Sequence, residues 1–198
     1  FEQVYFSCGA STEAEVLAAV QILKNGTCHY NLMHCVSSYP CPSEKANLGR
    51  ILWLKTLHSE VGFSDHTGST SIAAAAVALG ASVIEKHFTH NKKLPGNDHY
   101  HSADYIDLIK LNKDFTQVIN SMENDIIRKL KIEKKSRLNA RRSIYTTRNL
   151  KKNHRIQIND IICKRPATGL HPKYFDKIIG KKIKKSKKED APIYMKDF

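Results

Sequence analysis

Two histidines in this sequence follow short apolar runs, and each has a carboxylate close before it. His66 lies in "GFSDHTGS" directly after Asp65, and His87 lies in "VIEKHFTH" two residues after Glu85. Imidazole nitrogens bind divalent metal ions, and a neighbouring carboxylate can orient such a ligand or transfer protons. The pattern predicts that the two imidazoles share one ion and leave positions open for water and a substrate oxygen. The alternative is that both histidines are ordinary polar residues at strand ends.

The segments that carry these histidines alternate between strand-like and helix-like patterns. Four consecutive strand–helix units imply parallel strands joined by right-handed crossovers. We therefore predict an α/β fold whose sheet is half of an eight-stranded barrel, with a doubly wound sheet as the competing interpretation. Thr12 and Glu15 have capping-box spacing at the start of the first helix. The predicted strands cover 2–7, 30–37, 60–64 and 82–89, and the predicted helices cover 11–26, 44–58, 70–81 and 102–131.

Active sites of parallel barrels lie at the carboxyl ends of the strands. Four segments of this sequence put polar residues there, namely 7–9, 34–39, 64–67 and 85–87. A Pro-Gly loop after the last predicted strand adds four more polar side chains, those of Asn97, Asp98, His99 and His101. The alternative for this loop is plain solvated turn chemistry.

The charge of the chain is unevenly distributed. Residues 1–127 hold 9 Lys and Arg against 13 Asp and Glu, whereas residues 128–198 hold 23 against 6. Residues 131–141 have the charged, apolar-poor composition of a linker, and residues 142–198 read as a small β-rich domain with strand-like pieces at 142–147, 155–158, 161–166 and 191–195. Such a basic module could bind nucleic acid, an anionic membrane or an acidic domain. The lysine run 181–188 lacks the interleaved aromatics of a nucleic-acid stacking surface, so we rank nucleic acid last.

The remaining composition favours a cytoplasmic protein without a membrane segment. The five cysteines form no CxxC pair and their number is odd, which indicates reduced thiols. No apolar run approaches the roughly 20 residues that span a bilayer. The chain begins at Phe1, without methionine and with a strand-like run, from which we expect that the start of a longer protein is missing.

Several segments resemble the bacterial sialic acid synthases, a family that includes the N-acetylneuraminate, legionaminate and pseudaminate synthases. The resemblance rests on "LMHCVSSYPCPSEKANL", "GFSDHTGSTSIAAAAVALGASVIEKHFT", "LPGNDH", "RRSIYTTRNLKKN" and "IICKRPATGLHP", which occur in the family's order. It implies that residues 1–130 are the C-terminal half, strands 5–8, of a (β/α)8 TIM-type barrel. It also implies that residues 142–198 are an antifreeze-like (SAF) domain after a linker at 131–141.

The resemblance further implies a transferase that condenses phosphoenolpyruvate with an N-acetylmannosamine-type sugar. The products would be a nine-carbon α-keto acid and phosphate. His66 and His87 match the family's metal ligands, which hold Mn²⁺ or, alternatively, Mg²⁺ or Co²⁺, and Glu85 matches a carboxylate that handles protons. Further matches are Ser7, Ser37 and Ser64 for phosphoenolpyruvate, Tyr39 and Asp98 for the sugar, and Arg165 for an arginine that reaches the partner's site in a domain-swapped homodimer.

Two features of the sequence qualify this expectation. The family's first four strands are absent, so we do not expect this chain alone to be an active, stable monomer. "GNDHYHS" replaces the more usual "GPDHKAS", which leaves the sugar specificity open. The alternative function is a truncated, inactive or regulatory paralogue that acts as a binding module.

Overall fold

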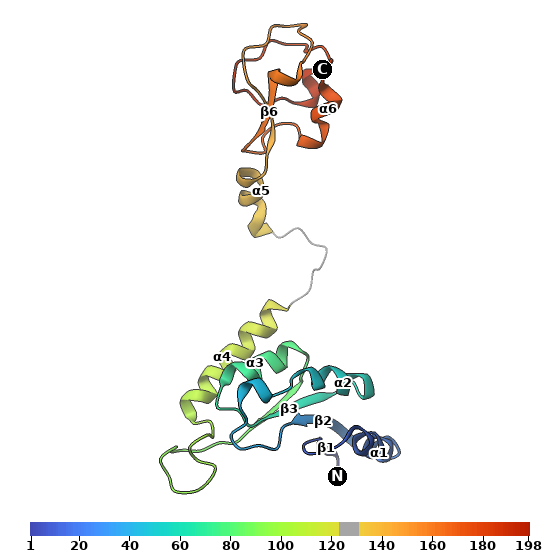
Figure 1. Ribbon diagram of the computed structural model, residues 1–198, viewed down its shortest axis with the longest axis vertical. Helices are drawn as coiled ribbons and strands as arrows, with labels where there is room; N and C mark the ends of the chain where they lie inside the picture. The colour runs from blue at the N-terminus through green and yellow to red at the C-terminus, as the bar shows by residue number, and fades with distance from the viewer. Residues whose placement is uncertain (123–130) are drawn as a thin grey trace. The chain divides into compact units, whose positions relative to one another are not determined.

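The chain folds into two compact units, which the computed structural model describes over residues 1–122 and 131–198 (Figure 1). The first unit, Phe1–Asn124, carries the two histidines, and the second, Asp125–Phe198, carries most of the positive charge. No helix in the described ranges is long and apolar enough to cross a membrane.

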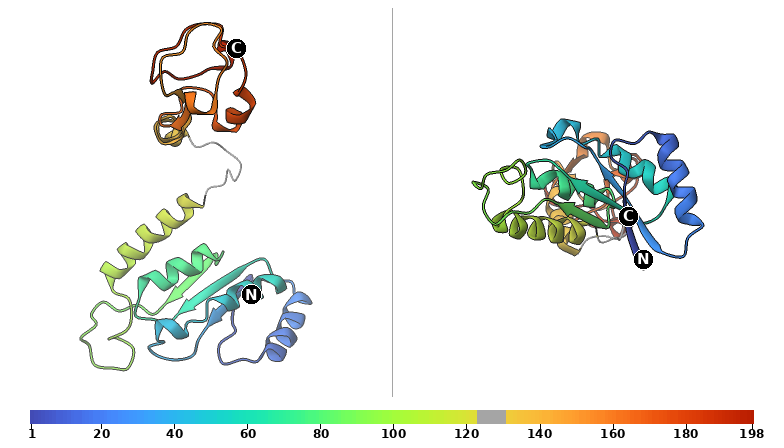
Figure 2. Two further views of the ribbon diagram at one scale, coloured as in Figure 1. Left: turned by 45° about the horizontal axis from the view of Figure 1, so that its top comes forward. Right: turned by 90° about the horizontal axis from the view of Figure 1, so that it is seen from below.

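The first unit is built on a curled parallel sheet with the strand order β1-β2-β3-β4 (Figures 1 and 2). A doubly wound sheet would reverse its strand order at a switch point, and this order does not reverse. The prediction of an α/β fold with a half-barrel sheet is therefore confirmed. The elements are β1 (Gln3–Ser7), α1 (Glu13–Lys24), β2 (His29–Cys35), η1 (Ser43–Lys45), α2 (Gly49–Leu57), β3 (Val61–Asp65), α3 (Thr70–Ala78), β4 (Val83–Lys86) and α4 (Tyr105–Ser121).

Local signals explain where these helices begin. The predicted capping box of α1 is present, because Glu15 N donates to Thr12 Oγ1 and Thr12 N donates to Glu15 Oε2. Helix α2 begins five residues later than predicted, since Asn47 adopts the left-handed conformation (φ 46°) and separates α2 from the turn η1. The predicted closing helix is α4 up to Ser121, and the rest of that prediction lies largely outside the described residues.

The two faces of the sheet differ in character. Leu32, Val61 and Phe63 are buried and form the core with apolar side chains of the helices, namely Val16, Val20, Ile51, Leu54 and Ala76. Because successive side chains of a strand alternate between faces, the neighbouring positions point to the inner side of the half-barrel. That inner side is more polar, and Ser7 and Glu85 are exposed there.

A buried ion pair ties β3 to β4 on the helix-covered face. Lys86 Nζ donates to Asp65 Oδ2 at 2.8 Å and to the carbonyl oxygen of Thr67 at 2.6 Å, while Thr67 N donates to Asp65 Oδ1 at 2.8 Å. The Asp65 and Lys86 side chains are only 0% and 8% exposed. Asp65 is directly opposite Lys86 in the register, just as Ser64 is opposite Glu85. The pair therefore helps to hold the next residues along, His66 and His87, at one edge of the sheet.

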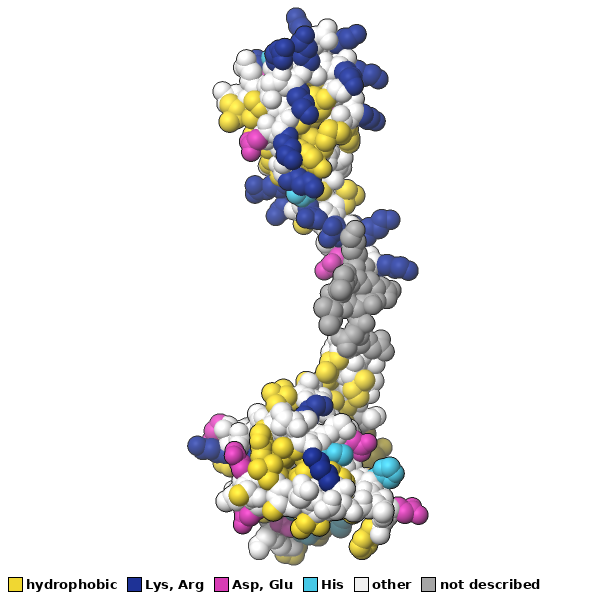
Figure 3. All heavy atoms as spheres, turned by 90° about the vertical axis from the view of Figure 1, so that its right-hand side faces the viewer, with side chains coloured by type: hydrophobic (Ala, Val, Ile, Leu, Met, Phe, Trp, Pro, Cys, Tyr) yellow, Lys and Arg dark blue, Asp and Glu magenta, His cyan; other side chains and the backbone are white. Residues whose placement is uncertain are grey.

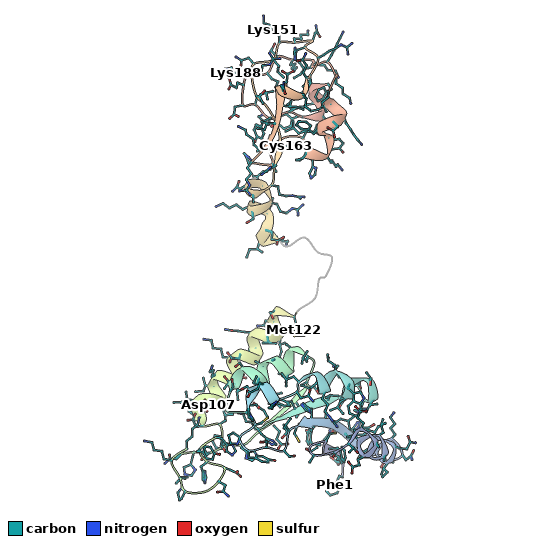
Figure 4. All side chains as sticks on the ribbon, in the orientation of Figure 1. Phe1, Asp107, Met122, Lys151, Cys163 and Lys188 are labelled. Atoms are coloured by element: carbon teal, nitrogen blue, oxygen red, sulfur yellow. The ribbon has the colours of Figure 1, made fainter. Side chains whose placement is uncertain are left out.

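The second unit is small and contains little regular structure. Its elements are η2 (Lys131–Glu133), α5 (Lys134–Ala140), β5 (Ser143–Thr146), η3 (Ile158–Asp160), β6 (Ile161–Lys164), η4 (Pro172–Tyr174), α6 (Phe175–Ile178) and η5 (Met195–Asp197), and β5 pairs with β6 in antiparallel fashion. Residues 131–140, which we expected to be linker, are thus helical. Seven residues form its core, namely Ile144, Leu150, Ile156, Ile161, Ile178, Ile183 and Ile193. Many lysine and arginine side chains project from the face of this unit that Figure 3 shows, and those of Lys151 and Lys188 project outward (Figure 4).

The predicted strands at 155–158 and 191–195 are wrong. These segments make only isolated bridges, Arg155 with Lys182 and Tyr145 with Pro192. Each is followed or interrupted by a 3₁₀ turn whose third residue is an aspartate that accepts a hydrogen bond from the backbone N–H three residues earlier. The aspartates satisfy the backbone locally and so compete with strand pairing.

Asp160 is fully buried and accepts hydrogen bonds from Gln157 N, His154 Nε2 and Arg148 Nε at 2.6 to 2.8 Å. Burial raises the pKa of Asp160, but these hydrogen bonds outweigh it and hold that pKa below its usual value. A carboxyl whose pKa is lowered by folding stabilises the protein above its unfolded pKa near about 3.9, and this stabilisation is lost as the pH falls through the folded pKa.

We therefore expect the free energy of unfolding of this unit to decrease as the pH drops below about 4. Asp160→Asn should lower stability at neutral pH and flatten that dependence, because the amide cannot titrate. Urea unfolding between about pH 3 and about pH 7 measures both effects. The exposed Asp176 provides the control Asp176→Asn. An unchanged pH slope in Asp160→Asn would contradict the prediction.

Candidate functional site

His66 and His87 meet at the carboxyl ends of β3 and β4, with their ring centroids 5.4 Å apart. His66 is buried, and its Nδ1 lies 2.7 Å from the carbonyl oxygen of Val36. A carbonyl oxygen can only accept, so Nδ1 carries a proton, and the lone pair of Nε2 faces the Ser64 hydroxyl at 3.3 Å. Hydrogen bonding of one ring nitrogen in this way is the usual support of a metal-binding histidine.

Glu85 is the carboxylate that belongs to this site. Ser64 Oγ donates to Glu85 Oε1 at 3.2 Å and lies 3.3 Å from His66 Nε2, so one buried hydroxyl lies between the carboxylate and the imidazole. The carboxylate next to His66 in sequence, Asp65, is instead bound to Lys86 on the opposite face of the sheet. Of the two carboxylates that the sequence placed beside the histidines, only Glu85 is therefore free for chemistry.

Tyr39 covers the histidines from the loop after β2. Its ring centroid lies 4.2 Å from that of His66, 5.5 Å from that of His87 and 6.3 Å from that of His101. The side chain is 50% exposed, so one side of the phenol faces solvent. An aromatic ring in this place can pack against a substrate that lies over the imidazoles.

Asp98 closes the site from the loop that follows β4. Its Oδ2 lies 3.7 Å from His87 Nδ1, and its Oδ1 lies 3.4 Å from His101 Nε2. The carboxylate is 62% exposed. A hollow of about 470 Å³ opens beside it, lined by Tyr39, Gly96, Asn97, Asp98 and Tyr100. The polar loop is thus part of the site and is more than a solvated turn.

The two other predicted serines lie further along the same edge of the sheet. Ser7 Oγ lies 3.0 Å from Cys35 Sγ, and a Cβ atom on Gly9 would come within 2.6 Å of Ser37 Oγ. Because Gly9 has no side chain, the segment after β1 can approach the end of β2 closely. Arg165 is exposed and lies directly after β6 in the second unit.

Arg50, beside Ser37, was not predicted from the sequence, whereas His34 belongs to the predicted polar run 34–39. A second hollow of about 490 Å³ is lined by Ser37, His34 and Arg50, among others. His34 is buried with its Nε2 bonded to the carbonyl oxygen of Ala46, and burial lowers its pKa. Arg50 Nη2 donates to the carbonyl oxygen of Ser11. Arg50 carried no signal in the sequence, because a single arginine in a helix is usually an exposed surface residue.

The donor set suits a divalent ion held by two protein ligands. Within the described residues no three His, Cys, Asp or Glu side chains are grouped as a complete metal site. Ser64 donates its hydroxyl hydrogen to Glu85, so the Nε2 lone pair of His66 is available to an ion. With His87 beside it, two imidazoles can bind while water and substrate oxygens complete the sphere. The fit rests on the fixed tautomer of His66.

The comparisons with known proteins now place the chain in a family. The model of the NeuB family matches residues 1–126, and that of the SAF domain matches residues 141–198. The chain belongs to the NeuB family. The likeness that the motifs indicated is thereby confirmed, including that to synthases of sialic, legionaminic and pseudaminic acids.

Individual relatives of this NeuB-family chain support the same assignment. The N,N'-diacetyllegionaminic acid synthase of Campylobacter jejuni is 35% identical over 97% of this chain and 59% of its own length. An uncharacterised protein of Methanocaldococcus jannaschii is 39% identical over 98% of this chain and 58% of its own. The solved N-acetylneuraminic acid synthetase of Leptospira borgpetersenii is 34% identical with a TM-score of 0.61, over 67% of this chain and 47% of that one. The chain thus spans less than two thirds of the length of these relatives.

Proposed function

We propose that this chain is part of a nonulosonate synthase, which condenses phosphoenolpyruvate with an N-acylated hexosamine of the N-acetylmannosamine type. The observation that carries the proposal is the cluster of His66, His87, Glu85 and Ser64 at the ends of adjacent parallel strands. Family membership supports it, because relatives that match nearly the whole chain bear the names of such synthases.

The reaction makes one carbon–carbon bond and one carbon–oxygen bond, and it breaks one carbon–oxygen bond. C3 of phosphoenolpyruvate bonds to the aldehyde carbon of the open-chain sugar, and the oxygen of a water molecule adds to C2. The bond between C2 and the phosphate oxygen then breaks, which leaves a nine-carbon α-keto acid and phosphate. One water proton ends on the former aldehyde oxygen and the other on phosphate, so the site must move protons as well as hold substrates.

The residues at the strand ends divide this work. Glu85 holds and transfers protons near the reacting carbons, and it can exchange them through the hydroxyl of Ser64. A divalent ion on His66 and His87, Mn²⁺ in preference to Mg²⁺ or Co²⁺, would polarise the aldehyde oxygen. In the same proposal Ser7, Ser37 and Ser64 bind phosphoenolpyruvate, while Tyr39 and Asp98 bind the sugar.

The complete enzyme in this proposal is a cytoplasmic, domain-swapped homodimer. The strands β1 to β4 are strands 5–8 of a (β/α)8 barrel. Ser7 and Glu85 are exposed on the inner face, and the other four strands of the complete barrel would cover them. The second unit is the SAF domain, and its Arg165 reaches the active site of the partner. Its positive charge would face an acidic barrel and anionic substrates, so no nucleic acid or membrane partner is invoked.

Phosphate release tests the proposal. We expect release from phosphoenolpyruvate with N-acetylmannosamine or another acylated hexosamine and Mn²⁺, in the complete natural protein that includes residues 1–198. The 198-residue chain alone should be inactive unless the family's first four strands are added. Inactivity of both across several acylated hexosamines would instead favour a regulatory paralogue that binds without catalysis.

A further inference from the structure

His101 differs from the other histidines of the site in having a buried nitrogen without a partner. Its side chain is only 4% exposed, and Nε2 makes no hydrogen bond with any group in the described part of the chain. Burying such a group without a partner costs free energy that a bond to a nearby acceptor would recover. An unsatisfied polar atom inside a candidate site indicates that its hydrogen bond forms when the ligand binds.

The carboxylate of Asp98 is an acceptor that lies close to this nitrogen. Oδ1 lies 3.4 Å from His101 Nε2, an approach that lacks hydrogen-bond geometry. The two partners differ in freedom, because the imidazole is buried whereas the carboxylate is 62% exposed and solvated. The backbone between them is fixed, since Ser102 N and Ser102 Oγ both donate to the carbonyl oxygen of Asp98. Only the carboxylate has to rotate slightly to complete the bond.

We infer that His101 is a positioning residue, which orients Asp98 for binding the sugar. The inference rests on the proposed function and deepens it. When the sugar fills the hollow beside Tyr39 and Asp98 and displaces water, His101 Nε2 donates to Oδ1. Oδ2 is then turned toward the sugar on the side of His87, where it can accept a hydrogen bond from a hydroxyl. His101 thereby contributes to sugar selectivity and leaves phosphoenolpyruvate binding unaffected.

Calorimetric titration of the complete natural protein that includes residues 1–198, in the presence of Mn²⁺, tests this role. The titrants are N-acetylmannosamine, a diacetamido hexose and, separately, phosphoenolpyruvate. His101→Ala should weaken binding of the accepted sugar by about 10- to 100-fold, as expected for loss of a hydrogen bond to a charged group. His101→Gln should restore most of that affinity, since its amide can donate from a similar place. The exposed His90 supplies the matched control His90→Ala, which should bind like the wild type.

A double-mutant cycle separates positioning from a general structural role. Because His101 acts through Asp98, His101→Ala should cost almost nothing further when Asp98 is already alanine. Phosphoenolpyruvate affinity and the thermal midpoint of His101→Gln should stay close to wild type. Equal losses for both substrates, additive losses in the cycle, or sugar binding by His101→Ala equal to that of the control would each overturn the inference.

The outcome is distinguishable from failure of the proposed function. Sugar binding that depends on His101 as described, without phosphate release, would refute the synthase proposal and support the inference. Phosphate release together with sugar binding that His101→Ala leaves unchanged would support the synthase proposal and overturn the inference. A wild-type protein that binds none of the sugars overturns the inference whatever the release assay shows.

Discussion

Substituting either histidine of the proposed metal site by alanine is expected to abolish the proposed synthase activity together with Mn²⁺ binding. His66→Ala removes an imidazole whose orientation is fixed by the carbonyl oxygen of Val36. His87→Ala removes the neighbouring imidazole, whose ring centroid lies 5.4 Å from that of His66. With only two protein ligands, the loss of one leaves a single imidazole, which cannot retain the ion against water. The rate should fall at least about 100-fold, because a Lewis acid supplies several kcal/mol of transition-state stabilisation. Manganese electron paramagnetic resonance and phosphate release measure the two effects separately.

Glu85→Gln is compared with the two histidine variants, because it should lower the rate without lowering Mn²⁺ affinity. The amide keeps the size of the side chain and can still accept from Ser64, so Mn²⁺ affinity should be preserved. Proton transfer would be lost, and the rate should fall by about 10²- to 10⁴-fold. Unchanged manganese affinity in both histidine variants would show that the metal assignment is wrong. Loss of manganese in Glu85→Gln would show that Glu85 is itself a ligand.

Breaking the ion pair beneath the site is expected to have the largest effect on stability. Lys86→Met leaves the carboxylate of Asp65 buried and without its cation, which typically costs about 3 to 5 kcal/mol. Chemical unfolding of the complete protein, followed by a probe in the first unit, measures the loss. The exposed Lys113 on α4 supplies the control Lys113→Met, whose effect should be small.

The double variant Asp65→Leu/Lys86→Met separates charge from packing. Because both charges are removed together, it should recover much of the stability that Lys86→Met loses. A free energy of unfolding for Lys86→Met within about 0.5 kcal/mol of the control would show that the pair contributes little. A double variant as unstable as Lys86→Met alone would show that the lost hydrogen bonds to the Thr67 backbone, and not the unpaired charge, account for the loss.

Much of the first unit could be predicted because its signals are local and periodic. The order of strands and helices followed from alternating apolar runs, and the start of α1 followed from Thr12 and Glu15. The site edge was predictable as well, since parallel strands end together and the polar residues follow them directly. Asn47 shows the limit: a single left-handed residue interrupted a segment whose composition was entirely compatible with helix.

The second unit and the role of Asp65 could not be predicted in the same way. The short pieces at 155–158 and 191–195 have apolar patterns typical of strands, yet a buried aspartate three residues along satisfies the backbone in each, and an apolar pattern does not show such a bond. Asp65 and Glu85 looked equivalent beside their histidines. Asp65 and Glu85 point to opposite faces of the sheet because side chains alternate along each strand. The register of β3 with β4 places Asp65 opposite Lys86, and the sequence does not show this register.

The opposite-face arrangement of neighbouring residues in β4 makes assembly of the site a condition for folding. If β4 paired with β3 one residue out of register, Glu85 and His87 would lie against the apolar helices and Lys86 would lie on the inner face. Asp65 would then be buried without its cation, at the cost given above. A misassembled copy would therefore unfold and be removed by proteases instead of persisting with a mispaired sheet. The buried pair of Asp65 and Lys86 thus favours the one strand register that places Glu85 and His87 on the inner face.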